Sequence, residues 1–242
     1  MRHPQREPTQ CFPINDVLMP LTRATMHLKP LVVAICALAL FSCRKESDAD
    51  QVATPNVAPQ AGIADFAPLD SGNYWIYERM NVDSNGAVIT GPWVDSVWVH
   101  GDTILWDGLQ YTVLCRAVNS NPLMIDREYW RIENNTMWEP AGGFLFQSGT
   151  YDQPLYTDTI GTNVSLTYSV LSQTETFDTQ QDQLTCYRVK ADLAVFGGAY
   201  PPIPAERQPY YLWSPNVGRV FSQEPFMSSG AVQRIALLRY HV

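Results

Sequence analysis

The sequence predicts an all-β domain formed by a single antiparallel meander that closes as a barrel or a sandwich. Segments that alternate polar with apolar or aromatic residues run from Asn73 to the C-terminus, and turn residues recur every 8 to 15 positions. No segment of this region shows the 3.6-residue apolar period of a helix. Residues 63–242 suffice for one domain with a sizeable core, and no repeat of fixed period divides them.

The expected strands follow one another from residue 73. Residues 73–80 alternate around aromatic side chains, and the turn at 83–86 leads into the strand-like segment 94–104. Asp107-Gly108 then turns the chain into residues 109–118. The remaining strand-like segments are 124–132, 136–140, 144–147, 154–160, 164–171, 183–196, 208–214, 218–224 and 232–242. Loops are expected at 119–122, 139–143 and the proline-rich stretch 196–209.

An export signal is predicted ahead of the domain, over residues 26–42. His27 and Lys29 form a short basic start, and residues 31–41 are unbroken apolar sequence. As a helix this run would be about 16 Å long, roughly half of a ~30 Å hydrocarbon core, so it fits a signal peptide better than a spanning helix. Residues 1–25 are proline-rich and without periodicity, and we interpret them as a mis-assigned or disordered extension.

The end of this segment points to a lipid anchor. Leu40-Phe41-Ser42-Cys43 resembles the lipobox of bacterial lipoproteins. The resemblance implies that diacylglycerol is attached to the Cys43 thiol, that the chain is cut before it, and that the lipid holds the protein on a membrane. Several acyl chains give stable anchoring where one is marginal. The alternative is an ordinary secretory signal, with Cys43 as a spare thiol.

A flexible tether is predicted between the anchor and the domain, over residues 43–62. The stretch has no aromatic residue before the domain and mixes prolines with small and charged side chains, so it cannot bury enough apolar surface to become ordered. Its start, residues 44–48 (RKESD), resembles the short charged export tag of Bacteroidota-type surface lipoproteins. That resemblance implies an outer-membrane location and display at the surface.

Two further stretches resemble a group of uncharacterised Bacteroidota-type outer-membrane lipoproteins. They are FAPLDSGNYWIYE (66–78) and YLWSPNVGRVFSQE (211–224). The resemblance implies an all-β, barrel-like domain and brings no catalytic residues with it. It implies structural roles for the residues that match its motifs: Gly72, Trp75, Tyr77 and Gly218.

Charge and cysteine content limit the cellular compartments and the classes of partner that fit this chain. From Cys43 onward there are 12 Lys and Arg against 22 Asp and Glu, a formal charge of about −10. This balance argues against a nucleic-acid partner and against electrostatic binding to anionic membranes. Cys115 and Cys186 lie in strand-like segments and form a candidate disulfide, which would close a loop of roughly 70 residues and contribute about 4 kcal/mol. The alternative is two buried thiols.

No catalytic residue, metal site or cofactor is predicted. His100 and His241, the two histidines after Cys43, have no partner at ligand spacing, and no nucleophile elbow or phosphate-binding loop is present. A glycosidase is the enzyme hardest to exclude, because it needs only two carboxylates. Asp126 and Glu128 share one strand face, and solvated charge is the ordinary explanation for them.

The aromatic content leaves three functions open. Of the seven tryptophans in the β domain, Trp93, Trp106 and Trp138 are the candidate ligand-facing ones, although ordinary strand packing also explains such rings. The first hypothesis is a non-enzymatic binding or structural module of the envelope, with an envelope protein as partner. The second is a surface glycan-binding or glycan-active protein. The third is a carrier of an apolar ligand inside a barrel.

Overall fold

A computed structural model describes residues 61–121, 123–160, 163–196, 203–226 and 229–242. These residues form twelve strands and four short 3-10 helices, which confirms the predicted all-β class. The strands are β1 (Tyr74–Val82), β2 (Val88–Ile104), β3 (Gln110–Ala117), β4 (Ile125–Glu133), β5 (Thr136–Trp138), β6 (Phe144–Gln147), β7 (Tyr156–Ile160), β8 (Val164–Asp178), β9 (Gln183–Val195), β10 (Tyr210–Ser214), β11 (Gly218–Pro225) and β12 (Val232–His241). The helices are η1 (Ile63–Phe66), η2 (Val118–Ser120), η3 (Pro140–Gly142) and η4 (Ala205–Arg207).

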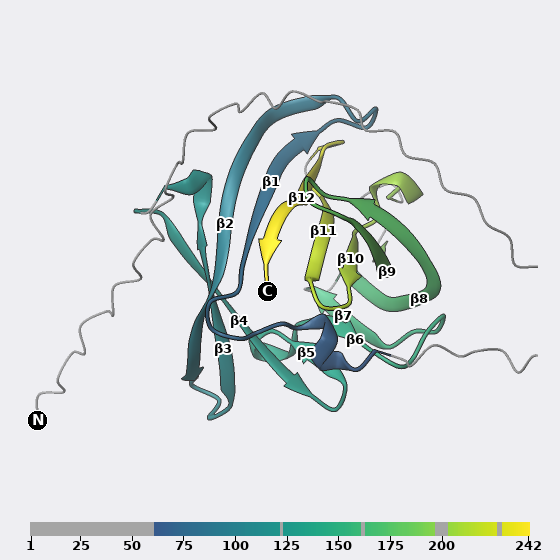
Figure 1. Ribbon diagram of the computed structural model, residues 1–242. Coiled ribbons are helices and arrows are strands. Elements are labelled where there is room, and N and C mark those ends of the chain that lie inside the picture. Colours follow the sequence, from purple (N-terminus) through teal and green to yellow (C-terminus); the bar gives the residue numbers. More distant parts are fainter. Residues whose placement is uncertain (1–60, 122, 161–162, 197–202, 227–228) are drawn as a thin grey trace, which may run out of the picture. The chain divides into compact units, whose positions relative to one another are not determined.

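All twelve strands belong to one antiparallel sheet. Their order is β6-β5-β4-β3-β2-β1-β12-β11-β10-β9-β8-β7, so two six-stranded meanders are joined where the first strand pairs with the last. In that pairing Trp75 lies opposite Tyr240. The sheet curls into a nearly closed barrel (Figure 1). Of the two closures that the sequence leaves open, the structure has the barrel.

Long bent strands produce the curl. β2 has 17 residues, β8 has 15 and β9 has 13. Register shifts interrupt their ladders between Val99 and Gly101 and between Val170 and Thr174. An extra residue on one strand bends it and increases its twist, so these irregularities let long strands wrap around an interior.

The barrel is not closed by hydrogen bonds, because β6 and β7 remain the two edges of the sheet. Aromatic side chains fill the space between these edges. The ring of Phe144 on β6 lies 5.9 Å from that of Tyr156 on β7 and 5.3 Å from that of Tyr168 on β8. We call Trp138, Phe144, Tyr156 and Tyr168 the aromatic seam.

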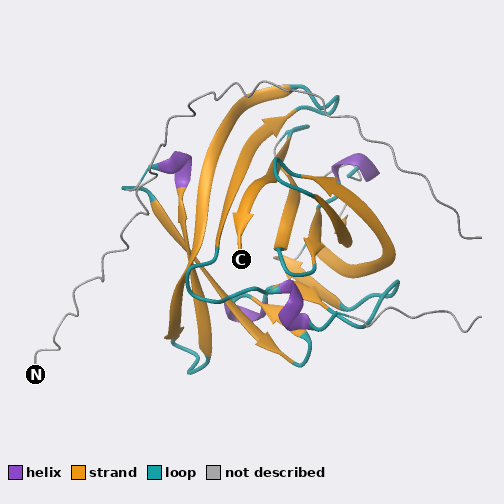
Figure 2. Ribbon diagram, in the orientation of Figure 1, coloured by secondary structure: helices purple, strands orange, loops and turns teal. Residues whose placement is uncertain are grey.

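The segment that precedes β1 closes one end of the barrel (Figure 2). η1 places Phe66 in the core, where the side chain is fully buried and its ring lies 4.5 Å from that of Phe146. The backbone N–H of Asn216, in the β10–β11 turn, donates to the carbonyl of Asp65 and ties the segment to the sheet. Ile63, Phe66 and Ala67, between the predicted tether and the first strand, are therefore part of the core.

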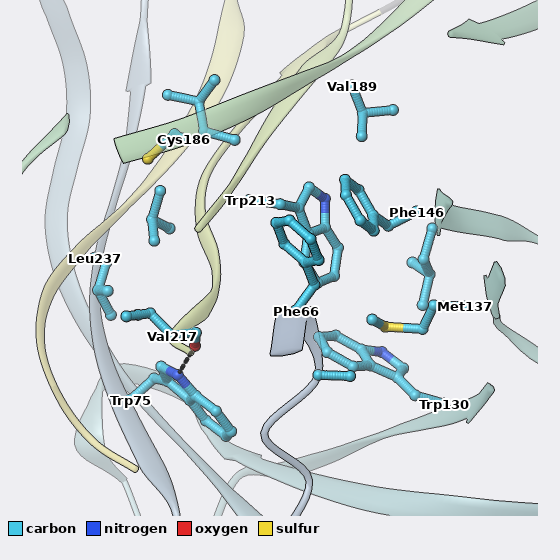
Figure 3. Packing of buried hydrophobic residues seen from close by; sticks show 14 of the residues in the cluster. Phe66, Trp75, Trp130, Met137, Phe146, Cys186, Val189, Trp213, Val217 and Leu237 are labelled. Carbon is cyan, nitrogen blue, oxygen red and sulfur yellow. Dashed lines mark hydrogen bonds between the residues drawn. The ribbon is translucent and has the colours of Figure 1, made fainter. Parts of the chain in front are cut away.

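An apolar core fills this end of the interior (Figure 3). Trp213, Phe66, Phe146 and Met137 are among its fully buried side chains. Trp75 is also buried, and its Nε1–H donates to the Val217 carbonyl at 2.7 Å. Burial of large aromatic and aliphatic side chains is the main stabilising contribution in a domain of this kind.

Several local predictions can be compared with the described residues. The 3-10 helices η2, η3 and η4 lie in or beside the three predicted loops. Trp75 and Tyr77 are buried, and Gly72 and Gly218 have positive φ, in agreement with their expected structural roles. The predicted extension, signal peptide and nearly all of the tether, with Cys43, lie outside the described residues. Within the described part of the chain, no helix has the length and apolar character needed to cross a membrane.

Candidate functional site

A chain of three charges occupies the barrel interior next to the apolar core. Glu128 on β4 lies between Arg116 on β3 and Arg219 on β11. Its Oε2 is 3.2 Å from Nη2 of Arg219, while its Oε1 contacts Nη2 of Arg116. We call these three residues the charged cluster.

Strand alternation places the side chains of Arg116 and Glu128 on the interior face of the sheet. On β3, Arg116 is two residues from the core residue Leu114, and on β4, Glu128 is two residues from the core residue Trp130. Residues two apart on a strand share a face. Leu114 and Glu128 are direct cross-strand partners, so both strands present this face to the same space.

The cluster lies deep in the domain but is not sealed from water. The side chains of Arg116, Glu128 and Arg219 are 18%, 23% and 15% exposed. The guanidinium of Arg219 also lies over the Trp130 ring, 5.4 Å from its centroid. At this level, therefore, side chains do not fill the interior completely, in contrast to the neighbouring apolar core.

The ion pairs set the protonation states of the cluster. Burial favours the neutral form of Glu128, but Arg219 and Arg116 outweigh it and hold the pKa of this carboxyl below its usual value. Burial likewise opposes the charge on Arg219, but Glu128 outweighs that effect and raises the pKa of the guanidinium. Glu128 and Arg219 are therefore both charged at neutral pH.

A small cavity adjoins the cluster. Its volume is about 10 Å³, which is close to the space that one water molecule needs. Glu128, Arg219, Trp130 and Tyr77 line it, together with Pro68 and Leu69 of the segment before β1. The Nε1–H of Trp130 is buried and meets no acceptor in full hydrogen-bond geometry among the described residues, but it is near enough to the Glu128 carboxylate to help lower the pKa of that group. The indole N–H thus faces the cavity on the Glu128 side.

A second carboxylate lies near the cluster and differs from Glu128. Glu139, in the β5–β6 connection, has no cation within ion-pairing distance in the described part of the chain. Burial raises the pKa of its carboxyl; Arg219 lowers this pKa, whereas Glu128 and Glu224 raise it further. Gly143 makes room for this side chain, because a Cβ on Gly143 would lie 3.2 Å from the Glu139 Cβ and Oε2.

Tyrosines complete this side of the interior. Burial raises the pKa of Tyr168 to about 12, and Asp158 and Glu139 act in the same direction. Burial, followed by the charge of Glu224, raises the pKa of Tyr211 as well. No described residue forms a hydrogen bond with the Tyr211 hydroxyl. The interior thus combines acceptors, donors and the rings of the aromatic seam.

The three candidate ligand-facing tryptophans are in separate places. Trp93 on β2 is half-buried under the guanidinium of Arg79, 4.9 Å from its ring centroid. Trp138 on β5 packs in the aromatic seam. Trp106 is 81% exposed in the β2–β3 turn. No ring contact in the described part of the chain joins any two of them, so a ligand role for each stays a prediction.

The candidate disulfide between Cys115 and Cys186 is absent, and the alternative of two buried thiols describes the structure. Cys186 is in the core, where burial raises the pKa of its thiol to about 12. Cys115 follows the core residue Leu114 on β3 and therefore points to the other face of the sheet. Two sulfurs on opposite faces cannot meet, which sequence spacing alone does not reveal.

A groove of about 790 Å³ lies outside the charged cluster, along β9 to β12 and η4. Its size is typical of a ligand site. Its main charged groups are already paired. Arg188 forms a two-pronged ion pair with Glu175 at 2.7 and 2.8 Å and covers the Tyr210 ring. Lys190 pairs with Asp192 at 2.7 Å. Glu206 and Arg234 also line the groove, and neither forms an ion pair within the described part of the chain.

Two features of the site were not identified from the sequence. Arg219 follows the Val-Gly motif, and Glu139 lies in a predicted loop, so neither stands in a pattern that indicates function. The sequence pattern favours solvated charge for Asp126 and Glu128, yet Glu128 belongs to the interior cluster. No group of three or more His, Cys, Asp or Glu side chains among the described residues could hold a metal ion.

Comparison with known proteins adds two distant structural likenesses. The first is a candidate exported protein with a YmcC-like fold from Bacteroides fragilis, which is 14% identical, has a TM-score of 0.41, and is matched over 75% of this chain and 100% of its own. The second is a candidate lipoprotein from Parabacteroides distasonis, which is 14% identical, has a TM-score of 0.39, and is matched over 76% of this chain and 100% of its own. No protein-family model and no curated protein matches the sequence.

Proposed function

We propose that the chain is an outer-membrane lipoprotein, anchored by lipid on Cys43, whose β domain is a non-enzymatic binding module. The lipobox-like sequence before Cys43 and the apolar run at 31–41 support the anchor. The polar residues 44–60 support a tether between the lipid and the domain. An intact-mass measurement of protein from membranes tests this, because lipid on a chain that begins at Cys43 is expected and an unmodified Cys43 would contradict it.

We further propose that the ligand occupies the barrel interior beside the charged cluster. One observation carries this: Arg116, Glu128 and Arg219 retain water access in an interior position that apolar side chains would fill more stably. Replacement of buried ion pairs by well-packed apolar residues is often neutral or stabilising by about 1–4 kcal/mol. Charges kept in such a place, together with the unpaired Glu139, suggest recognition of a ligand rather than stabilisation of the fold.

The chemistry of this end of the interior favours a small ligand rich in hydroxyl groups, such as a sugar. Because the cavity beside the cluster holds only about one water molecule, such binding requires side chains there to move when the ligand enters. A hydroxyl both donates and accepts, which suits Glu139 as acceptor and Trp130 Nε1–H as donor. The aromatic seam supplies rings beside these groups. The glycan hypothesis therefore moves from the exposed Trp106 to the interior, where Trp138 belongs to the aromatic seam. An apolar cargo is less suited, since the apolar part of the interior is packed with side chains.

A thermal-shift screen tests this proposal. The full chain in detergent would be heated with a panel of mono- and disaccharides and, separately, with fatty acids. We expect at least one saccharide to raise Tm, because a ligand at 100 times its Kd stabilises the folded state by about 2.7 kcal/mol. Glu139→Gln should abolish the shift, and Glu133→Gln, at a half-exposed carboxylate, should leave it. A shift with fatty acids alone would contradict a polar ligand.

The opposite pKa shifts of Glu128 and Glu139 favour one alternative, glycoside hydrolysis. There a protonated Glu139 would donate its proton to the glycosidic oxygen, and the Glu128 carboxylate would activate a water molecule. The two arginines on Glu128 reduce its basicity, which makes binding the better account. Incubation with any saccharide found in the screen, followed by mass spectrometry, separates the two: hydrolysis products that disappear with Glu139→Gln would establish the enzyme.

A further inference from the structure

The hairpin between β2 and β3 ends in an exposed apolar tip. Ile104, Trp106 and Leu109 are 71%, 81% and 42% exposed. We call these three residues the hairpin tip. Isolated exposed apolar residues are common on soluble proteins, but a tryptophan flanked by two large aliphatic side chains in one turn is a candidate contact surface.

The turn holds this tip in one conformation. Gly108 N–H donates to the Leu105 carbonyl at 3.0 Å, and Gly108 has the positive φ of +78° that such a turn requires. The Asp107 carboxylate accepts from Leu109 N–H at 3.0 Å and from the Tyr111 hydroxyl at 2.7 Å. The charge of Asp107 is therefore occupied locally, and the apolar side chains project from an ordered hairpin.

The hairpin projects from the end of the barrel at which the chain enters. β1 begins at Tyr74, opposite Trp98, whereas β2 continues from there to Ile104. Six residues of strand extend about 20 Å. η1, which lies between Ala61 and the start of β1, is at this same lower end in Figure 1. The tip and the attachment point of the preceding chain thus share one end of the domain.

If Cys43 carries lipid, the membrane lies within tether length of this end of the domain. This step rests on the proposed function. Ala61 is 18 residues from Cys43. Eighteen residues span at most about 60 Å, and a flexible tether of that length has an r.m.s. span of about 25 Å. Lipid on Cys43 would therefore hold the tip at a high effective concentration at the membrane surface, where even weak contacts form.

We propose that the hairpin tip docks the domain on the bilayer by inserting Trp106 and its aliphatic neighbours into the lipid interface. Tryptophan is enriched at the depth of the lipid headgroups, and buried aliphatic area adds to the binding. Charge does not drive the contact, because Asp102 and Asp107 flank the tip and the chain is acidic overall. Docking should therefore occur on zwitterionic phosphatidylcholine and change little with salt.

Depth-dependent quenching tests the proposal on the lipid-anchored full chain. The protein would be reconstituted into phosphatidylcholine vesicles with brominated acyl chains, which quench tryptophan at the interface. We expect wild type to lose part of its emission, Trp106→Phe to lack that quenched component, and Trp93→Phe to retain it as the matched control. Equal quenching in wild type and Trp106→Phe would overturn the proposal, and would point to a protein partner for the tip.

A second measurement separates this inference from the anchor. Cys43→Ser protein, mixed with the same vesicles, tests the tip without lipid on the chain. We expect Trp106→Ala to weaken its partitioning into vesicles about tenfold, while Phe196→Ala, at another exposed aromatic residue, leaves it unchanged. Unmodified Cys43 in native protein would contradict the proposed anchor alone. Identical partitioning of the Cys43→Ser protein with and without Trp106→Ala would contradict the docking alone.

Discussion

The barrel interior has two parts, the apolar core and the charged cluster, and the same strands contribute side chains to both. On β4, Trp130 faces the apolar core and Glu128, two residues away, belongs to the charged cluster. The core is closed: Phe66 and Phe146 are fully buried. The cluster retains 15–23% exposure on its three side chains. Strand alternation alone therefore sets which side chains point inward, while their chemistry decides whether that space is filled or open.

The comparison teaches where stability and function lie in this domain. Filling the core contributes directly to the free energy of unfolding, since each large buried side chain is removed from water. The charged cluster holds itself together by ion pairs that offset the loss of hydration of its members. Beside the second region lies Glu139, a carboxyl group whose environment disfavours its charged form.

The largest expected effect is in the core. Phe66→Ala should lower the free energy of unfolding by about 4 kcal/mol, because it leaves a cavity among Phe146 and Tyr187. Urea unfolding measures the change. Phe196→Ala is the control: this side chain is 53% exposed, and its loss should change little. Equal effects for both variants would contradict the assignment of Phe66 to the core.

The second-largest loss of stability is expected in the charged cluster. Glu128→Gln should lower the free energy of unfolding by about 3 kcal/mol, since Arg116 and Arg219 lose their shared carboxylate. This difference in stability between wild type and Glu128→Gln should vanish at acid pH. The lowered pKa of Glu128 contributes stability above the usual carboxyl pKa, and that stability is lost as pH falls through the pKa of the folded state. Combining Glu128→Gln with Arg219→Met should recover part of the loss, and strict additivity would argue against their coupling.

Steric crowding at Glu139 should lower the free energy of unfolding by less than loss of the Glu128 charge. The φ of Gly143 is −61°, so alanine is tolerated by the backbone, and the strain comes only from the new Cβ at 3.2 Å from Glu139. We expect Gly143→Ala to lower the free energy of unfolding by about 1 kcal/mol and to weaken ligand binding. Gly230→Ala, where a Cβ meets open space, is the matched control for chemical denaturation. A ligand affinity that Gly143→Ala leaves unchanged would place the ligand elsewhere.

Neutralising Glu139 should stabilise the domain slightly. A raised pKa means that folding favours the protonated carboxyl, so ionisation opposes folding once pH exceeds the usual carboxyl pKa of about 4.3. Glu139→Gln should therefore raise Tm at pH 7 by less than the preceding changes, and the gain should disappear below pH 4. A lower Tm at neutral pH would show that Glu139 contributes to stability instead.

The smallest effect is expected from reducing agents. Because Cys115 and Cys186 are buried thiols on opposite faces of the sheet, a reductant should leave Tm unchanged. Alkylation after denaturation without reduction, followed by peptide mapping, should label both residues. A disulfide-linked peptide pair would contradict the structure.

The sequence by itself determined the all-β class and most of the strands. The prediction succeeded where the signal is local: aromatic alternation in 73–80, turn residues such as Asp107-Gly108, and prolines in 196–209 act through nearby backbone and side chains. The strands were less well predicted in extent. β2 begins at Val88 rather than 94 and β8 ends at Asp178 rather than 171, because pairing with a long neighbour extends a strand beyond its own pattern.

Tertiary structure alone decided the closure and the site. The pairing of β1 with β12 joins residues at least 150 positions apart, and no local pattern encodes it. The same holds for the meeting of Glu128 with Arg219, 91 residues away. The face on which Cys115 lies depends on the register of β3, where a shift of one residue reverses every side chain. Local chemistry thus fixed the strands, and long-range register fixed which of their side chains share an interior.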